Sequence, residues 1–140
     1  MTYRVAVLAL AFVLACGIGR HEAPSQEAPS RGLHRGVRTE LFLGRVGPDG
    51  GIVDDEAWRA FLADVVTPRF PAGFTVIEAA GQYRNGAGSE VTRERSEVLV
   101  VVHEGDERAE AALREIVEVY KQRFGQRAVL RVDGAAMVGF

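Results

Sequence analysis

Hydrophobic residues recur with two different periods after residue 37, and the two periods separate candidate strands from candidate helices. The segments 37–46, 74–84, 90–103 and 128–133 are rich in β-branched and aromatic residues and predict four strands. The third strand ends in the apolar run 98–102, which is typical of a central strand. Residues 135–140 extend or follow the fourth strand.

Two other segments carry apolar residues at helical spacing. In the first, the apolar stripe begins after Asp54, a suitable N-cap, and the helix must end before Pro68. In the second, the stripe lies between Asp106 as N-cap and Gly125 as the terminating glycine. The stripes consist of Trp58, Phe61, Leu62 and Val65, and of Ala109, Ala112, Leu113, Ile116, Val117, Tyr120 and Phe124.

The order strand–helix–strand–strand–helix–strand predicts an α+β domain over residues 37–140. It is the order of the ferredoxin-like βαββαβ fold, a four-stranded antiparallel sheet with two helices on one face. In that topology the first and third strands are central, which agrees with the apolar run of the third. We therefore expect an open sheet face on the side away from the helices.

Residues 1–15 have the pattern of a signal peptide. Arg4 precedes eleven uncharged residues, 5–15, which as a helix would span roughly 17 Å, less than a ~30 Å hydrocarbon core. The run ends at Cys16, and 13–16 resembles a bacterial lipobox with lipid attached to that cysteine. Ordinary cleavage after Ala15 and an uncleaved anchor are the alternatives.

Residues 16–36 predict a disordered tether between that anchor and the domain. The segment repeats Glu-Ala-Pro-Ser at 22–25 and 27–30 and is poor in large apolar residues, so ordering it would bury too little surface. We therefore expect an exported lipoprotein on the periplasmic or outer side of a membrane. A soluble periplasmic or secreted protein is the alternative.

Composition excludes several classes of function. The net charge of −2 argues against nucleic-acid binding. Because Cys16 is the only cysteine, the domain has no internal disulfide and no cysteine-based metal site. His21, His34 and His103 lack metal-ligand spacing, and no motif predicts a cofactor.

Polar residues on the strands are the candidates for a ligand site. If Leu41 and Leu43 face the core, Arg38 and Glu40 face the open side. One hypothesis is a site with Glu40 as general base, in which Gln82 and an arginine, Arg38 or Arg95, hold a carboxylate. The parity of the third strand leaves open whether Glu94 and Ser96 or Arg95 and Glu97 share this face. The other hypothesis is a solvated face or a dimer interface.

Several motifs resemble an uncharacterised family of small bacterial exported proteins, a domain of unknown function. They are Thr-Glu-Leu-Phe-Leu-Gly at 39–44, Thr-Pro-Arg-Phe-Pro-Ala-Gly-Phe-Thr at 67–75 and Gly-Gln-Tyr at 81–83. The resemblance extends over about 38–140. Tyr83 stands where family members often have Trp, and Glu97 where they often have Lys. The resemblance implies export and one domain, with no known activity.

Two functions of different classes follow from these patterns. The first expectation is a non-enzymatic binding or interaction domain that dimerises through its open sheet face or an edge strand. The alternative is an enzyme acting on a small carboxylated metabolite in a sheet-lined, dimeric pocket. An enzyme would need a pocket of roughly several hundred Å³ in which Glu40 and an arginine converge. Neither hypothesis identifies the ligand.

Overall fold

The computed structural model describes residues 32–47, 49–84 and 86–139. The predicted signal peptide, Cys16, His21 and most of the predicted tether lie outside these residues. In chain order the elements are β1 (His34–Gly44), α1 (Asp55–Phe61), the π-helical turn η1 (Leu62–Val66), β2 (Thr75–Arg84), β3 (Val91–His103), α2 (Glu107–Phe124) and β4 (Leu130–Val138).

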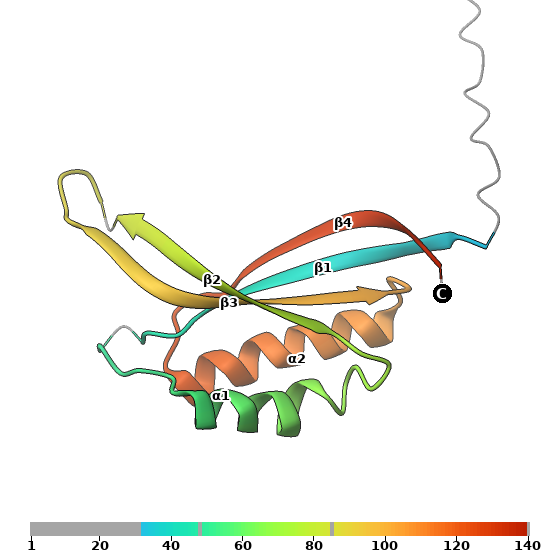
Figure 1. The fold of residues 1–140 in the computed structure, drawn as a ribbon, viewed down its shortest axis with the longest axis horizontal. Helices are drawn as coiled ribbons and strands as arrows, with labels where there is room; N and C mark the ends of the chain where they lie inside the picture. Colours follow the sequence, from blue (N-terminus) through green and yellow to red (C-terminus); the bar gives the residue numbers. More distant parts are fainter. Residues whose placement is uncertain (1–31, 48, 85, 140) are drawn as a thin grey trace, which may run out of the picture. The chain divides into compact units, whose positions relative to one another are not determined.

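The four strands form one antiparallel sheet in the order β2-β3-β1-β4, and the helices lie against one face of it (Figure 1). This confirms the predicted α+β architecture, which is consistent with a ferredoxin-like fold. The expected central strands are β1 and β3. Leu41 of β1 lies opposite Leu99 of β3, so the apolar run of β3 pairs with the middle of β1.

The core lies between the sheet and the helices. From the sheet, Leu41, Leu43 and Leu99 are fully buried, and from the helices Phe61 and Tyr120 are fully buried. The rings of Phe61 and Tyr120 pack edge to face, with centroids 5.0 Å apart. The predicted apolar stripes are therefore the inner faces of α1–η1 and α2.

Both predicted helix starts have the expected caps. The side chain of Asp54 accepts a hydrogen bond from the backbone N of Ala57, and that of Asp106 accepts one from the N of Ala109, each at 2.8 Å. α2 ends at Gly125, which adopts φ 64°, a left-handed conformation that glycine tolerates best.

β1 begins earlier than the sequence predicts, and β4 takes up part of 135–140, as one of the two expectations for that segment stated. β1 begins at His34, three residues before the expected start, and β4 continues to Val138. His34 lies opposite Val138 and Gly36 opposite Ala136, so each extension supplies the hydrogen-bonding partner of the other. Residues 34–36 are therefore part of the sheet rather than of the tether.

Among the described residues, no helix has the length and apolar character that spanning a bilayer would require.

Candidate functional site

The predicted site residues divide between the two faces of the sheet. The strand registers place Arg38 and Glu40 on the open face, as the sequence predicts. They place Glu94 and Ser96 on the same face, which the sequence left undecided. Gln82 and Arg95 lie on the face that bears the helices, because they share the parity of Val76 and of its partner Leu99 in the core. The sheet therefore does not bring Gln82 or Arg95 to Glu40.

Glu40 is paired with Arg38 on the sheet surface. Arg38 donates from Nε at 2.8 Å and from Nη2 at 2.6 Å to the same oxygen, Oε1 of Glu40. The hollow that both residues line has a volume of about 160 Å³. This is below the several hundred Å³ that small-molecule sites occupy. Glu40 therefore does not meet the condition stated above for a catalytic base.

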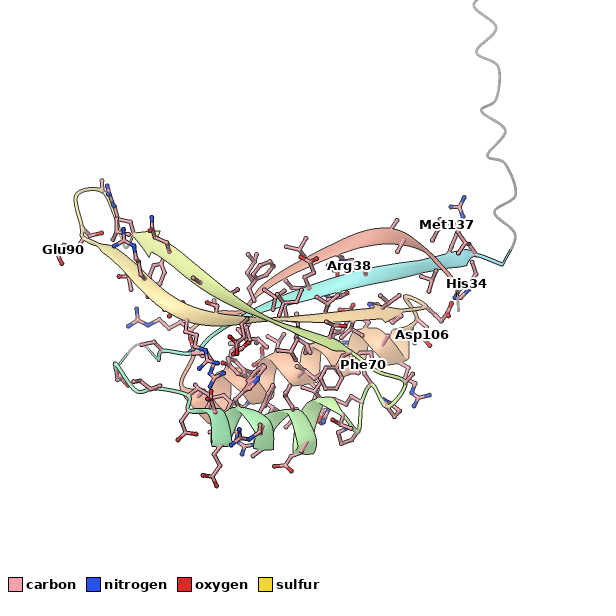
Figure 2. All side chains as sticks on the ribbon, viewed as in Figure 1. His34, Arg38, Phe70, Glu90, Asp106 and Met137 are labelled. Atoms are coloured by element: carbon pink, nitrogen blue, oxygen red, sulfur yellow. The ribbon has the colours of Figure 1, made fainter. Side chains whose placement is uncertain are left out.

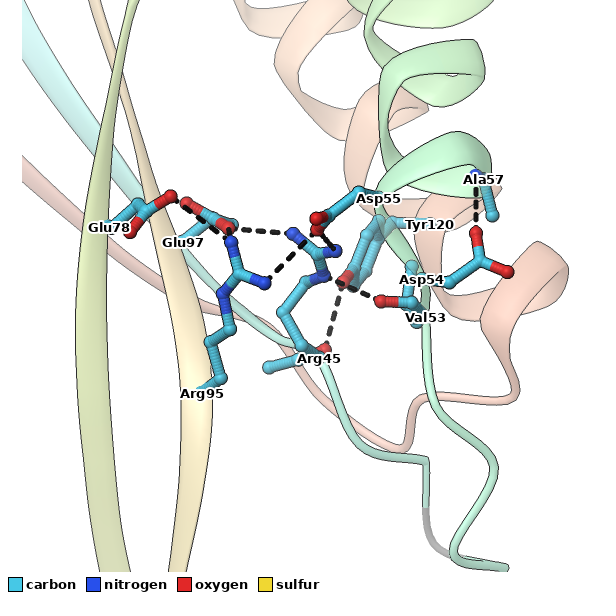
Figure 3. A network of polar contacts seen from close by, with 10 residues as sticks. Arg45, Val53, Asp54, Asp55, Ala57, Glu78, Arg95, Glu97 and Tyr120 are labelled. Carbon is cyan, nitrogen blue, oxygen red and sulfur yellow. Dashed lines mark hydrogen bonds and ion pairs between the residues drawn. The ribbon is translucent and has the colours of Figure 1, made fainter.

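Arg95 and Gln82 are also engaged elsewhere. Arg95 donates to Asp55 and to Glu78, each at 3.1 Å, beside the start of α1 (Figure 3). Arg93 donates from Nε to the Gln82 side-chain oxygen at 3.0 Å. These contacts join side chains on the helix-side face, and they leave neither residue in place to hold a substrate carboxylate on the open face.

A buried ion pair lies next to the Arg95 contacts. Arg45 and Glu97 are 2% and 1% exposed, and Arg45 Nη1 donates to Glu97 Oε1 at 2.6 Å (Figure 3). Arg45 also donates to the Val53 carbonyl at 2.7 Å and to Asp55 at 2.6 Å. Because its guanidinium is fully engaged within the protein, we assign this pair to the structure rather than to a reaction.

A Thr–His–Asp chain crosses β3, β1 and β4, but its polarity is wrong for activating a nucleophile. Thr39 Oγ1 donates to Asp133 and lies 2.9 Å from His103 Nε2. His103 Nδ1 accepts from the backbone N of Gly105, so the proton of a neutral His103 is on Nε2 and is donated to Thr39. Thr39 is also fully buried.

A larger hollow lies at the other end of the sheet, where β2 and β3 extend beyond the helices. Its volume is about 640 Å³. Glu94 lines it from β3, Tyr83 lines it from β2, and Arg127 lines it from the segment after α2. The other lining residues are Val46, Gly47, Gly50, Thr92, Gln126 and Ala128.

Two glycines beside β3 leave space for its side chains on the open face, Gly44 for Glu94 and Gly81 for Ser96. A Cβ on Gly44 of β1 would lie 2.8 Å from Glu94 Oε1, and a Cβ on Gly81 of β2 would lie 3.6 Å from Glu94 Cγ and 3.0 Å from Ser96 Oγ. The first distance is a clash. The space for the carboxylate therefore depends on Gly44, while Gly81 makes room for Ser96.

Glu94 lacks a partner within the described part of the chain. Its carboxylate is half-buried and forms no hydrogen bond or ion pair with a described residue. Removal from water raises the pKa of Glu94 above its usual 4.5. A carboxylate with these properties is stabilised by a proton or by a cationic ligand.

Arg127 brings the opposite charge to the same hollow. It is exposed and likewise forms no hydrogen bond or ion pair with a described residue. Its neighbour Gln126 donates from Nε2 to the carbonyls of Gly44 and Val46, at 3.1 and 3.0 Å. These bonds attach the segment that carries Arg127 to the end of β1, beside Gly44.

Sequence reasoning found part of this site. Glu94 and Ser96 were candidates, and Tyr83 and Gly44 lie in the family motifs. Arg127 has no sequence signal, because one arginine in a short connection resembles any solvated arginine. No group of three or more metal-ligating side chains occurs among residues 32–139 that the structure describes.

Another hollow, of about 530 Å³, lies beside the start of α2. Its lining includes Asp106 and Glu110. Asp106 caps α2, and Glu110 is paired with Arg131, at 2.6 Å from Arg131 Nη2. Glu107 and Arg114, which also line this hollow, are exposed. The hollow at Glu94 is the better candidate, because it contains the carboxylate whose pKa burial raises without a compensating partner.

The fold is similar to that of a phage enzyme. The phage SAM lyase in complex with S-methyl-5′-thioadenosine has a TM-score of 0.55 and 13% sequence identity, over 75% of this chain and 90% of that one. The apo phage SAM lyase has a TM-score of 0.54 and 13% identity, over 76% and 90%. At this identity the likeness concerns the fold. No curated protein matches the sequence.

These structures contradict the first expectation, a non-enzymatic binding domain. Both of these structures are of an enzyme, the phage SAM lyase, whereas the first expectation was a non-enzymatic domain. The expectation rested on the lack of a visible catalytic motif in the sequence, and a fold shared with an enzyme leaves no such local motif.

The family resemblance is confirmed over the folded part of the chain. The model of the family "Protein of unknown function (DUF3574)" matches residues 38–140. That range begins within β1 and includes every other helix and strand, together with Glu94 and Arg127. The chain therefore belongs to the DUF3574 family.

Proposed function

We propose that this protein is an enzyme that acts on a small carboxylated metabolite in the hollow lined by Glu94, Tyr83 and Arg127. The observation that carries the proposal is a half-buried carboxylate without a partner, Glu94, in one hollow of about 640 Å³ that the exposed guanidinium of Arg127 also lines. Active sites are the usual place for partly desolvated ionisable groups without a structural partner.

The two charges have different roles in this proposal. Arg127 binds the substrate carboxylate, because a guanidinium presents two parallel N–H donors to a carboxylate. Glu94 is the general base, and its raised pKa makes it a stronger base than a solvated glutamate. Tyr83, 46% exposed, offers a ring against which a planar part of the substrate can stack.

S-adenosylmethionine is the first substrate to test. The proteins of similar fold are named as SAM lyases, and one of them is in complex with S-methyl-5′-thioadenosine. S-adenosylmethionine carries a carboxylate for Arg127 and a sulfonium cation that an unpaired Glu94 would attract. In this step Glu94 takes a proton from Cβ of the methionine part, a C=C double bond forms between Cβ and Cγ, and the electron pair of the broken Cγ–S bond leaves with sulfur as the neutral thioether S-methyl-5′-thioadenosine. The leaving group then needs no acid, and the one base that the hollow supplies is sufficient.

The test measures release of S-methyl-5′-thioadenosine from S-adenosylmethionine by chromatography, with binding followed by calorimetry. We expect Glu94→Gln to lower kcat/KM by about 100-fold or more, since general bases typically contribute 10²–10⁴-fold. We expect Arg127→Met to act mainly on KM, because it removes a binding contact.

Glu90→Gln is the matched control, because Glu90 is an exposed glutamate near the far end of the β2–β3 hairpin (Figure 2). It should leave both constants unchanged. Full activity of Glu94→Gln would overturn the role of Glu94. If neither S-adenosylmethionine nor other carboxylated sulfonium compounds bind at millimolar concentration, the proposed substrate class is wrong.

We further propose that the chain is exported and attached to a membrane through a lipid on Cys16. The support is the apolar run 5–15, the lipobox-like 13–16 and the absence of any other cysteine. Radiolabelled palmitate should label the full chain in cells and should not label Cys16→Ser. Equal labelling of both proteins would refute lipid attachment at Cys16.

A further inference from the structure

The open face of the sheet is apolar at its centre. Ile77 of β2 lies opposite Val98 of β3, Val98 lies opposite Phe42 of β1, and Phe42 lies opposite Leu130 of β4. These four side chains form one row across all four strands. Several large apolar side chains on this face are exposed: Ile77 by 47%, Val102 by 46%, Leu130 by 60% and Val132 by 46%.

An apolar surface that spans a whole sheet is unfavourable in water. Val98 and Val100, in the middle of the face, are only 8% and 7% exposed, so their neighbours already shield them. The exposed residues lie on both sides of this centre, with Ile77 on β2 and Leu130 and Val132 on β4. Such a surface marks an interaction site.

The charges next to this surface complement themselves. Arg38 and Glu40 are two residues apart on β1 and both face the open side, next to Val100, Val102 and Val132. Within one chain Arg38 donates from Nε and Nη2 to Oε1 of Glu40, and neither Arg38 Nη1 nor Glu40 Oε2 bonds to another described residue. A second copy related by a two-fold axis near β1 would bring its Nη1 to this Oε2 and its Oε2 to this Nη1, joining two pairs into one network.

The same face continues into the proposed active site. Ser96 and then Glu94 follow Val98 on the open side of β3. Beyond them the outer ends of β2 and β3, residues 81–84 and 91–94, extend past the helices (Figure 1). Residues 82–84 and 92–93 of this extension are exposed, and a two-stranded ribbon without a third layer is marginally stable alone.

We propose that a second copy of this chain binds the open sheet face through a two-fold axis, and that this contact closes the open side of the hollow at Glu94. The dimer itself is independent of the catalytic proposal, whereas the closure rests on it. Closure would remove Glu94 further from water and would hold the β2–β3 extension in place.

The test is sedimentation equilibrium of the full chain carrying Cys16→Ser, which prevents an intermolecular disulfide. We expect a species of twice the chain mass. Leu130→Glu should raise the dimer dissociation constant by about 100-fold or more, because it brings two unpaired charges into an apolar contact. The monomeric variant should also bind S-adenosylmethionine at least about tenfold more weakly.

Met137→Glu is the matched control. Met137 lies on the same strand, β4, and is 54% exposed, but the strand register places it on the opposite face from Leu130. It should leave the dimer intact. A monomeric parent chain, or a dimer that Leu130→Glu does not weaken, would overturn the interface. A monomeric Leu130→Glu that binds the ligand with unchanged affinity would overturn the closure while leaving the catalytic proposal standing.

Discussion

Glu94 differs in one property from the other acidic side chains of the described residues. Asp55, Glu110 and Asp133 have lowered pKa values, because arginines and Thr39 donate hydrogen bonds to their carboxylates. The pKa of Glu94 is raised, because burial acts on it without a compensating partner. At neutral pH the ionised Glu94 lowers the free energy of unfolding, because its carboxylate is partly removed from water without a partner. This loss of stability is the reason why we propose a functional role for Glu94.

The raised pKa of Glu94 should make the stability of the folded protein depend on pH. The folded-state pKa of Glu94 lies above the usual 4.5, so its contribution to stability is fully present below about pH 4.5 and is lost as pH rises through the folded-state pKa. We expect Glu94→Gln to unfold at a higher temperature than the parent chain at pH 7, and at the same temperature at pH 4.

Calorimetric unfolding of both proteins at the two pH values checks this prediction. Glu90→Gln again serves as the control and should show no pH-dependent difference. If Glu94→Gln is less stable than the parent at pH 7, Glu94 has a stabilising partner and its assignment as an unpaired base is wrong.

At the scale of elements, the buried Arg45–Glu97 pair joins the end of β1 to β3 and to the loop before α1. Arg45 donates to Glu97, to the Val53 carbonyl and to Asp55. The Arg45 guanidinium also lies over the Trp58 ring, 5.5 Å from its centroid. These contacts hold the start of α1 against the sheet.

Breaking this pair should destabilise the protein strongly. Arg45→Met leaves Glu97 buried without a partner, and we expect a loss of about 3–5 kcal/mol in the free energy of unfolding. Arg45→Met with Glu97→Leu should recover much of that loss, because no uncompensated charge remains. The measurement is urea-induced unfolding followed by circular dichroism.

Lys121→Met is a control for an exposed pair, since Lys121 binds Glu118 on the surface of α2 at 3.0 Å. We expect less than about 1 kcal/mol from it. A double variant as unstable as Arg45→Met alone would show that the arginine acts through its other contacts, with Val53, Asp55 and Trp58.

At the scale of the whole molecule, the sheet separates stability from function. The helix-side face contains the core and the buried Arg45–Glu97 pair, while the open face contains Glu94, the Arg38–Glu40 pair and the exposed apolar residues. The proposed site lies at the edge of the helix layer, where Gln126 attaches the segment after α2 to the end of β1. A dimer through the open face would therefore add to the site without disturbing the core.

The local elements were predictable from the sequence. The caps at Asp54 and Asp106, the terminating Gly125 and the apolar run of β3 act within a few residues of themselves, so periodicity reveals them. The order of elements then limited the fold to few arrangements. Leu41 and Leu43 also identified the two faces of β1, because that strand alternates clearly.

The candidate site was predictable only in part. Glu94 and Ser96 were among the candidates, but Gln82 was grouped with them and lies on the other face. The centre of β2, Ala79-Ala80-Gly81, carries no contrast between apolar and polar residues, so its parity could not be read. A shift of one residue exchanges the two faces of a strand, and only pairing with β3 removes that ambiguity.

By itself, therefore, the sequence determined the number and order of the elements, where the helices begin and end, and which strands are central. The tertiary structure decided which charges are paired and which are left unpaired. Arg45 and Glu97 are 52 residues apart and meet in the core, whereas Glu94 and Arg127 line one hollow without a partner. Electrostatic pairing depends on distance in space, which local patterns do not record.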